Sequence, residues 1–296
     1  MLSFDPYSIP TKDLHQYMVS AVAPRPIAWV STVDEDGNPN LAPYSFFNAF
    51  SSNPPILVFS SNRRVSDGTT KDTLHNIEAT MECVINMVSY DVVRQMAVTG
   101  VEFPANMNEF EKAGVTPLAS VAVQPFRVKE SPVQMECKVS QIIPLGDKGG
   151  AGHLIICNIV HFHINKLVLD ESGRIDAHKI DLMGRLGRTF YSRTSQGLMS
   201  ILQTQTDLVV GYDALPEGIR NSSVFTGNNL GQLAGLQALP SQDTLDTLRK
   251  EDAAVQKILF MSKNKQKDLQ LWAKTELDNN NTLLGAQLAM LSCLTE

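Results

Sequence analysis

The 296-residue chain is poor in cysteine, and the cysteines that it has are scattered. Its four cysteines are Cys83, Cys137, Cys157 and Cys293, and no two of them form a CxxC pair. Structural zinc sites and disulfide frameworks both rely on closely spaced cysteines, so this pattern argues against either. We therefore expect reduced thiols and a cytoplasmic protein.

Charge is also sparse, and neither sign is concentrated in one place. Charged residues make up 19% of the chain, and 25 Lys and Arg against 31 Asp and Glu give a formal net charge of −6. No basic run is long enough to attract a phosphate backbone against this negative background. The sequence therefore predicts no nucleic-acid partner.

The sequence shows no segment suited to a membrane. The first residues lack the basic start and the apolar run of a secretory signal. Residues 37–62 carry no charge and are long enough to span a bilayer, but four prolines and several asparagines interrupt them. We therefore expect no membrane association.

What the chain does have is enough hydrophobic sequence, 43%, for a core, and a first half rich in strand patterns. Residues 27–33 are apolar or β-branched and precede turn residues at 34–38, which predicts a hairpin. Residues 135–139 alternate as a half-buried strand does, and residues 153–164 suit a strand covered on both faces. These strands do not alternate regularly with helices, so we predict a mainly β fold with flanking helices (α+β), built on an antiparallel barrel.

The composition changes after Ser195, which suggests a second part of the chain. Residues 221–235 are rich in Ser, Asn and Gly, and residues 243–291 follow a helical pattern. We therefore divide the chain into a barrel domain at 1–194 and a mostly helical extension at 195–296. The extension is expected to act as a lid or as a dimer element.

The most informative stretches are residues 24–32, PRPIAWVST, and residues 40–48, NLAPYSFFN. In the second stretch two aromatic residues lie between Ser45 and Asn48 with no charge nearby. Such a segment can offer backbone polar groups and a flat apolar wall to a planar heterocycle. The alternative is a phenylalanine-rich core strand with a polar turn.

A second cluster, residues 60–74, combines hydroxyls with basic residues. A helix beginning at Thr70 would direct its free N–H groups and the positive end of its dipole at this cluster, where Lys71 and Arg63 lie. That arrangement predicts a phosphate site, although the spacing is not that of a P-loop and an ordinary exposed loop is the alternative. Arg25, held between two prolines, is either an aimed ligand-binding side chain or a surface arginine.

His161 and His163 lie two residues apart and so share one face of a strand. No carboxylate or cysteine close in sequence completes a metal-binding set, so we predict no metal. One histidine is expected near a ligand, and the other is expected to pack. No GxSxG motif or recognisable cysteine nucleophile supports triad chemistry.

At residues 24–32 and 40–48 the chain resembles the flavin reductase-like family of FMN-binding split-barrel proteins, over roughly residues 4–193. Arg185 and Gly187 match the end of the family domain, whereas Arg188 stands where a second glycine is common. The resemblance implies a six-stranded antiparallel split β-barrel that forms a homodimer, with FMN near the dimer interface.

The resemblance also implies site residues. The residues implied along the isoalloxazine ring are Ser45, Phe46, Phe47 and Asn48. Those implied at the phosphate are Ser61, Lys71, Asp72 and Thr73. Three further cofactor-binding residues are implied nearby, namely Arg25, Ser31 and Thr32. NADH or NADPH is the implied reductant, and the protein's part is to orient both rings. His163, or His161 if the strand is turned the other way, is our hypothesis for a catalytic residue on the substrate side.

Three functions agree with these observations. The sequence favours an FMN-dependent oxidoreductase that reduces flavin or another small acceptor with NAD(P)H. An FMN-binding electron carrier would keep the flavin but take electrons from a protein partner without nicotinamide turnover. A flavin- or tetrapyrrole-binding module without catalysis is the third, because small β-barrels are reused for many ligands.

Overall fold

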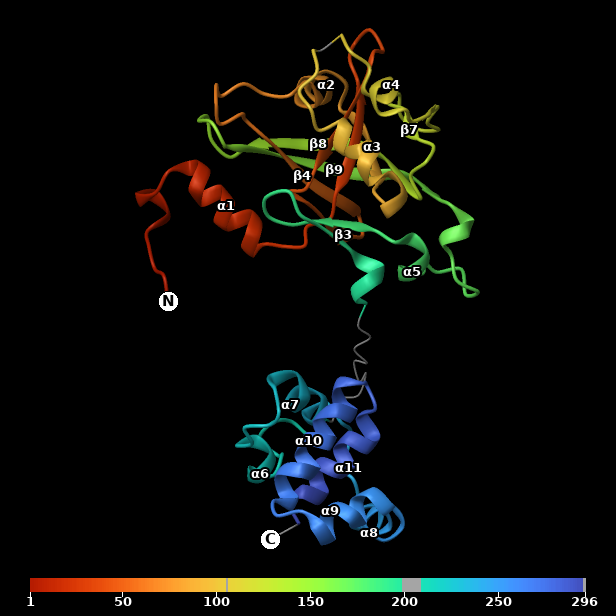
Figure 1. Ribbon diagram of the computed structural model, residues 1–296. Coiled ribbons are helices and arrows are strands. Elements are labelled where there is room, and N and C mark those ends of the chain that lie inside the picture. Colours follow the sequence, from red (N-terminus) through yellow and green to blue (C-terminus); the bar gives the residue numbers. More distant parts are fainter. Residues whose placement is uncertain (105, 199–208, 295–296) are drawn as a thin grey trace. The chain divides into compact units, whose positions relative to one another are not determined.

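A computed structural model describes residues 1–104, 106–198 and 209–294 (Figure 1). Two compact units divide the chain, Met1–Leu198 and Met199–Glu296. The first is built around a β-sheet, and the described part of the second is helical.

The first unit contains a seven-stranded sheet in the order β2-β1-β5-β8-β9-β4-β3. Every neighbouring pair is antiparallel, including the predicted hairpin β1–β2. The prediction of a mainly β fold with flanking helices is therefore confirmed. The strands of the sheet are β1 (Ala28–Val33), β2 (Pro39–Tyr44), β3 (Phe47–Ser52), β4 (Pro55–Asn62), β5 (Glu82–Met87), β8 (Val133–Pro144) and β9 (Gly152–Ile164); β6 (Pro117–Leu118) pairs with β7 (Arg127–Val128), and β10 (Met183–Arg185) pairs with β11 (Tyr191–Arg193).

The count of six strands is not confirmed, because the chain from Pro39 to Ser52 is divided at Ser45 and Phe46. Its first half, β2, forms one edge of the sheet, and its second half, β3, forms the other. Only two residues join the two edges, so the sheet must curve until its edges approach each other there. The Ser60 amide donates to the Phe46 carbonyl at 2.8 Å at this corner.

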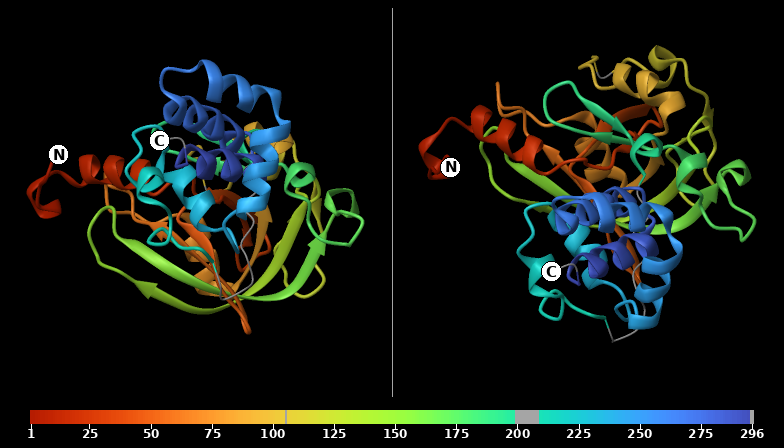
Figure 2. Two further views of the ribbon diagram at one scale, coloured as in Figure 1. Left: turned by 90° about the horizontal axis from the view of Figure 1, so that it is seen from below. Right: turned by 60° about the horizontal axis from the view of Figure 1, so that its bottom comes forward.

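The two longest strands, β8 and β9, run along each other through the middle of the sheet and bend in both views of Figure 2. Two register shifts interrupt their pairing, and such bulges increase local twist and bending. The expectation that β9 is covered on both faces holds only for its first half. Because β4 pairs with β9 no further than Asn158, Phe162 and Ile164 lie beyond it and are exposed.

Both faces of β1 are buried, since its successive side chains enter two different hydrophobic clusters. Ala28 and Val30 pack in the cluster that includes Leu74 and Ile77 of α2, whereas Trp29 packs in the other. These contacts fix α2 against the sheet near the ends of β2 and β4. The helices of this unit are α1 (Thr11–Ala21), α2 (Asp72–Thr80), α3 (Val93–Val98), α4 (Glu109–Ala113) and α5 (Ala177–Ile180), with short 3-10 turns η1 (Pro6–Ser8), η2 (Tyr90–Val92), η3 (Lys166–Val168) and η4 (Thr194–Gly197).

The second unit has a hydrophobic core of its own. Helices α10 and α11 approach closely at Gly285, where a β-carbon would lie 2.7 Å from Leu277 Cγ. The helices expected between residues 243 and 291 are present. None of the helices in the described ranges combines the length and apolar character needed to cross a membrane. The helices of this unit are α6 (Glu217–Arg220), α7 (Gly227–Ala234), α8 (Gln242–Glu251), α9 (Ala253–Met261), α10 (Lys265–Asp278) and α11 (Thr282–Ser292).

Candidate functional site

A cavity of about 310 Å³ lies in the first unit, between α1, the corner of the sheet where β2 meets β3, the end of β4 and the β10–β11 turn. Its volume is at the lower end of the range for small-molecule sites. The described residues that line it are His15, Gln16, Val19, Arg25, Pro43, Tyr44, Ser45, Phe46, Ser60, Asn62, Lys71, Arg185, Leu186 and Arg188.

The cavity is cationic. Arg25, Lys71, Arg185 and Arg188 line it, and none of its described lining residues is acidic, although the whole chain has a net charge of −6. Burial and then the charge of Arg185 lower the pKa of Arg25. Burial and then the charge of Arg64 lower the pKa of Lys71. An anion bound here would offset this repulsion, so the cavity suits an anionic ligand.

Arg25 is a wall of the cavity whose guanidinium is held by the protein. It donates to the carbonyls of Val19 and Val22 at the end of α1, and to the carbonyl of Leu186 at 3.3 Å. Its Nε donates to Ser45 Oγ at 3.3 Å. With 7% of its surface exposed, Arg25 is not a surface arginine, and it ties α1 to the β10–β11 turn.

The four residues expected along the flavin ring divide into two pairs. Ser45 and Phe46 line the cavity. Phe47 packs against the hydrophobic core, and Asn48 is exposed, with its Oδ1 accepting from the following amide at 2.8 Å. Successive residues of a strand face opposite sides, so Phe46 and Phe47 cannot both form the wall. Phe47 therefore agrees with the interpretation of a core strand, whereas Ser45 and Phe46 lie where a ligand in the cavity would contact them.

The expected phosphate-binding helix, α2, begins at Asp72 rather than at Thr70. The Thr70 hydroxyl lies 2.5 Å from His75 Nε2 instead of capping the helix. The residue before the helix is Lys71, which provides no side-chain cap, and no hydrogen bond from the first amides of α2 to a side chain is present within the described residues. Lys71 Nζ lies 5.2 Å from the centre of the Tyr44 ring and belongs to the cavity lining.

Two buried hydroxyls have no hydrogen-bond partner within the described residues: Tyr44 Oη, on a lining residue, and Ser61 Oγ, on a residue that lies outside the lining although its neighbours Ser60 and Asn62 belong to it. Burial raises the pKa of Tyr44 to about 12. Leaving a buried hydroxyl unpaired costs about 1–3 kcal/mol. A polar ligand reaching these atoms would remove that cost, so they fit the oxygen-rich part of FMN.

Four other expected site residues lie outside the cavity lining. Asp72 is the first residue of α2. The hydroxyls of the remaining three are used inside the protein, because Thr73 and Thr32 both accept from Asn40, at 2.9 and 3.2 Å, and Ser31 donates to the Phe126 carbonyl. Thr32 and Thr73 thus help to fasten α2 to the sheet.

His163 lies far from the cavity within one chain. Strand β9 pairs His153 with Ser61 near the cavity, and His163 follows ten residues later, which is at most about 33 Å along the strand. His163 is not among the described residues that line the cavity. His163 Nε2 lies 2.7 Å from a carboxylate oxygen of Glu136, and its ring centre lies 4.5 Å from that of His161.

Glu136 is a carboxylate beside the two histidines that the sequence did not reveal. It is distant from them along the chain, and the pairing of β8 with β9 brings it to them. Its side chain is fully buried and also accepts from the amides of Val121 and Ala122. Burial raises its pKa, but these hydrogen bonds and His163 outweigh burial and leave the pKa lowered. Within the described residues, no three His, Cys, Asp or Glu side chains are arranged to hold a metal ion.

Several cavity residues were missed from the sequence. His15 and Gln16 on α1 carry no local signal, since only the folded chain brings α1 to the corner of the sheet. Asn62 and Tyr44 lay within stretches already singled out. Arg188 was visible as part of a basic turn, without any indication that the turn borders the cavity.

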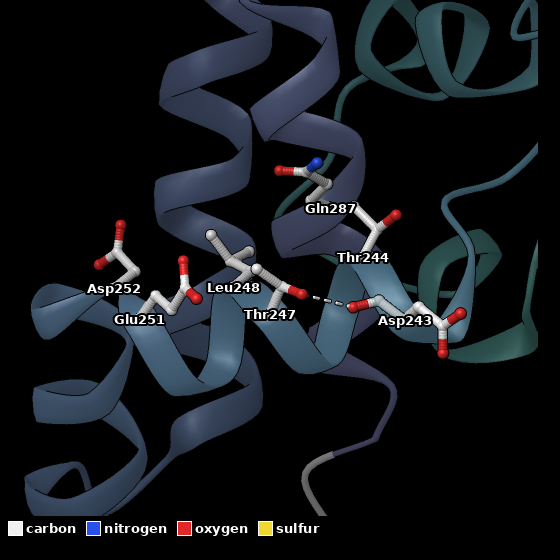
Figure 3. A pocket seen from close by; sticks show the side chains of 7 residues that line it. All are labelled: Asp243, Thr244, Thr247, Leu248, Glu251, Asp252 and Gln287. Atoms are coloured by element: carbon white, nitrogen blue, oxygen red, sulfur yellow. Dashed lines mark hydrogen bonds between the residues drawn. The ribbon is translucent and has the colours of Figure 1, made fainter.

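The second unit has a larger cavity, of about 550 Å³, with the opposite charge (Figure 3). Three carboxylates, Asp243, Glu251 and Asp252, line it, and none of its described lining residues is basic. Figure 3 shows that Thr244 comes from α8 and Gln287 from α11. These carboxylates would repel an anionic cofactor. The cavity of the second unit is therefore the poorer candidate for the cofactor site, although its volume is larger.

Comparison with known proteins shows the family of the first unit. A sequence model of the flavin reductase like domain matches residues 20–177. A protein of Aquifex aeolicus is 42% identical over 178 residues, which are 60% of this chain and 88% of that protein. Among solved structures, nitrilotriacetate monooxygenase component B of Bacillus cereus is 33% identical with a TM-score of 0.64, covering 68% of this chain and 98% of that one. A 2-nitrobenzoate 2-nitroreductase of Pseudomonas fluorescens is 27% identical with a TM-score of 0.61, covering 69% and 98%.

The fold and these similarities thus define a flavoprotein of the split-barrel class. The chain belongs to the flavin reductase-like family, and these similarities support an oxidoreductase.

Proposed function

We propose that the protein is an FMN-dependent oxidoreductase that uses NADH or NADPH to reduce flavin or another small acceptor. The observation that carries the proposal is the cavity at the corner of the sheet. It combines four cationic side chains, no described acidic lining residue, an aromatic residue at its wall and two unpaired buried hydroxyls beside it.

The lining residues suggest how FMN would be held. Lys71 and the uncapped start of α2 would take the phosphate, and Ser61 and Tyr44 would supply hydroxyls beside it. Ser45 and Phe46 would border the ring system. Thr73 and Thr32 would act by keeping α2 in place, since both accept hydrogen bonds from Asn40.

FMN held by Lys71, Ser45 and Phe46 would supply hydride-transfer chemistry, which no side chain provides. The protein would therefore bind both rings, orient them and keep water from the reacting face. Such positioning alone lowers a barrier substantially, because two reactants held face to face need no further encounter.

We further propose a homodimer. In one chain the edge strand β3 is unpaired along its outer side, and Phe50 on it is 68% exposed. Phe162 and Ile164 on β9 are also exposed. An uncovered edge strand invites pairing, and burying these apolar side chains would favour a second copy of the chain. Because His163 lies far from the cavity of its own chain, a role on the substrate side requires the partner's cavity.

Titration of the purified protein with FMN, followed by NADH and NADPH oxidation assays under saturating FMN, tests the proposal. We expect quenching of FMN fluorescence with one FMN per chain and turnover with at least one nicotinamide. FMN binding without nicotinamide turnover would instead indicate an electron carrier. No FMN binding would remove the proposal altogether.

A further inference from the structure

Arg188 has an unfavourable backbone conformation at the edge of the cavity. It lies in the turn between β10 and β11 with φ of +54°, in the left-handed region that favours glycine. Arg185 holds this turn by donating to the carbonyls of Arg188 and Phe190. A non-glycine residue in such a conformation is a reason to look for a role of its side chain.

The Arg188 side chain is available for a ligand. It is exposed and lines the cavity, and its guanidinium has no hydrogen-bond, ion-pair or ring partner within the described residues. The other two arginines of the cavity differ. Arg25 is held by three carbonyls and Ser45, and Arg185 by two carbonyls and the ring of Tyr191, 4.6 Å away.

We propose that Arg188 determines specificity for a second ligand by binding a phosphate group of the nicotinamide dinucleotide. The proposal rests on the proposed function. FMN carries a single phosphate, and the site proposed for it is Lys71 with the start of α2. A cavity of about 310 Å³ leaves little room for a second ligand beside FMN, so that ligand's charged part must lie at the rim, where Arg188 is exposed.

The phosphate has two sources, the 2′-phosphate that only NADPH carries and the pyrophosphate that both nucleotides carry. An arginine fork suits either, through paired N–H···O hydrogen bonds. A contact of Arg188 with the 2′-phosphate would favour NADPH over NADH, whereas a contact with the pyrophosphate would serve both nucleotides.

The test measures binding of NADP⁺ and NAD⁺, which do not turn over, to the FMN-loaded full-length protein by calorimetry. Arg188→Gln removes the charge at similar length, Arg188→Lys keeps the charge, and Arg174→Gln is the control at an exposed arginine outside the cavity. We expect Arg188→Gln to raise the Kd about tenfold, Arg188→Lys to raise it less, and Arg174→Gln to leave it unchanged. FMN affinity is measured by fluorescence quenching in all four proteins, and because Arg188 lies at the rim we expect Arg188→Gln to change it less than it changes the Kd for the dinucleotide.

The outcomes separate the sources and the two proposals. If Arg188→Gln loses affinity for NADP⁺ alone, Arg188 binds the 2′-phosphate. If it loses affinity for both nucleotides, Arg188 binds the pyrophosphate. The inference is overturned if Arg188→Gln binds both nucleotides as the unsubstituted protein does, or if the variant loses FMN affinity instead. If the unsubstituted protein itself fails to bind FMN, the proposed function is what fails.

Discussion

The ammonium of Lys71 lies 5.2 Å from the centre of the Tyr44 ring. Lys71 precedes the first residue of α2, and Tyr44 ends β2, so the contact joins the helix to the corner where the sheet changes edge. Lys71 is thus a largely desolvated cation above a buried ring, beside helix amides that lack a side-chain cap. This combination is what an anionic cofactor would exploit.

The pH dependence of FMN binding should report Lys71. Burial lowers the pKa of Lys71, and a bound phosphate would favour the charged form and raise that pKa again. Lys71 must then take up a proton on binding once the pH exceeds its lowered pKa. We therefore expect FMN affinity to fall as the pH rises through that pKa, and Lys71→Met to bind more weakly with a flatter alkaline limb. If FMN affinity falls equally at alkaline pH in the unsubstituted protein and in Lys71→Met, Lys71 does not contact the phosphate.

Replacing Tyr44 with Phe should act in opposite directions on stability and on binding. The change removes an unpaired buried hydroxyl, so the FMN-free protein should unfold at the same or a higher temperature, while FMN affinity falls. Tyr7→Phe, at an exposed tyrosine, is the matched control. Calorimetric unfolding and FMN titration measure both effects, and unchanged FMN affinity would remove Tyr44 from the site.

Tyr44 should also shape the alkaline stability of the FMN-free protein. Its pKa is about 12 in the folded protein against about 10 for an unfolded chain. Between these values the unfolded chain loses the proton first, so the free energy of unfolding should fall as the pH rises from 10 to 12. Tyr44→Phe should show a smaller fall in denaturant titrations at pH 10, 11 and 12, and an identical fall would contradict the burial assigned to this hydroxyl.

The histidine pair on β9 tests the substrate-side hypothesis. His163→Ala should leave FMN affinity unchanged, because His163 does not line the cavity of its own chain, yet lower NAD(P)H turnover if it reaches the partner's cavity. It should also cost stability, since the buried Glu136 loses a hydrogen bond. The hypothesis ends if neither His163→Ala nor His161→Ala changes turnover.

Removal of the C-terminal unit tests the expected lid or dimer role. The described residues that line the cationic cavity lie between His15 and Arg188, so a chain ending at Ser195 should still bind FMN. We expect the truncated chain to differ in dimer mass or in acceptor range. Sedimentation and an acceptor panel measure these properties, and no difference in either would rule the role out.

The fold class was accessible from the sequence because strand patterns and turns are local. The division of residues 39–52 between two edges of the sheet was not, since it depends on closure over the whole unit. At the site, Lys71, Ser45 and Phe46 were predicted and line the cavity, whereas Phe47 and Asn48 were assigned by adjacency and face elsewhere. Glu136 and His15 could not be predicted from the sequence. Strand pairing brings Glu136 to His163, and the placement of α1 brings His15 to the cavity.

The most direct test of the central claim is the absorbance spectrum of the purified protein after addition of FMN and removal of the unbound flavin, followed by anaerobic addition of NADH and then NADPH. The account predicts a retained flavin spectrum that bleaches with at least one nicotinamide. A protein that retains no flavin, or whose flavin stays oxidised with both nucleotides, would contradict it.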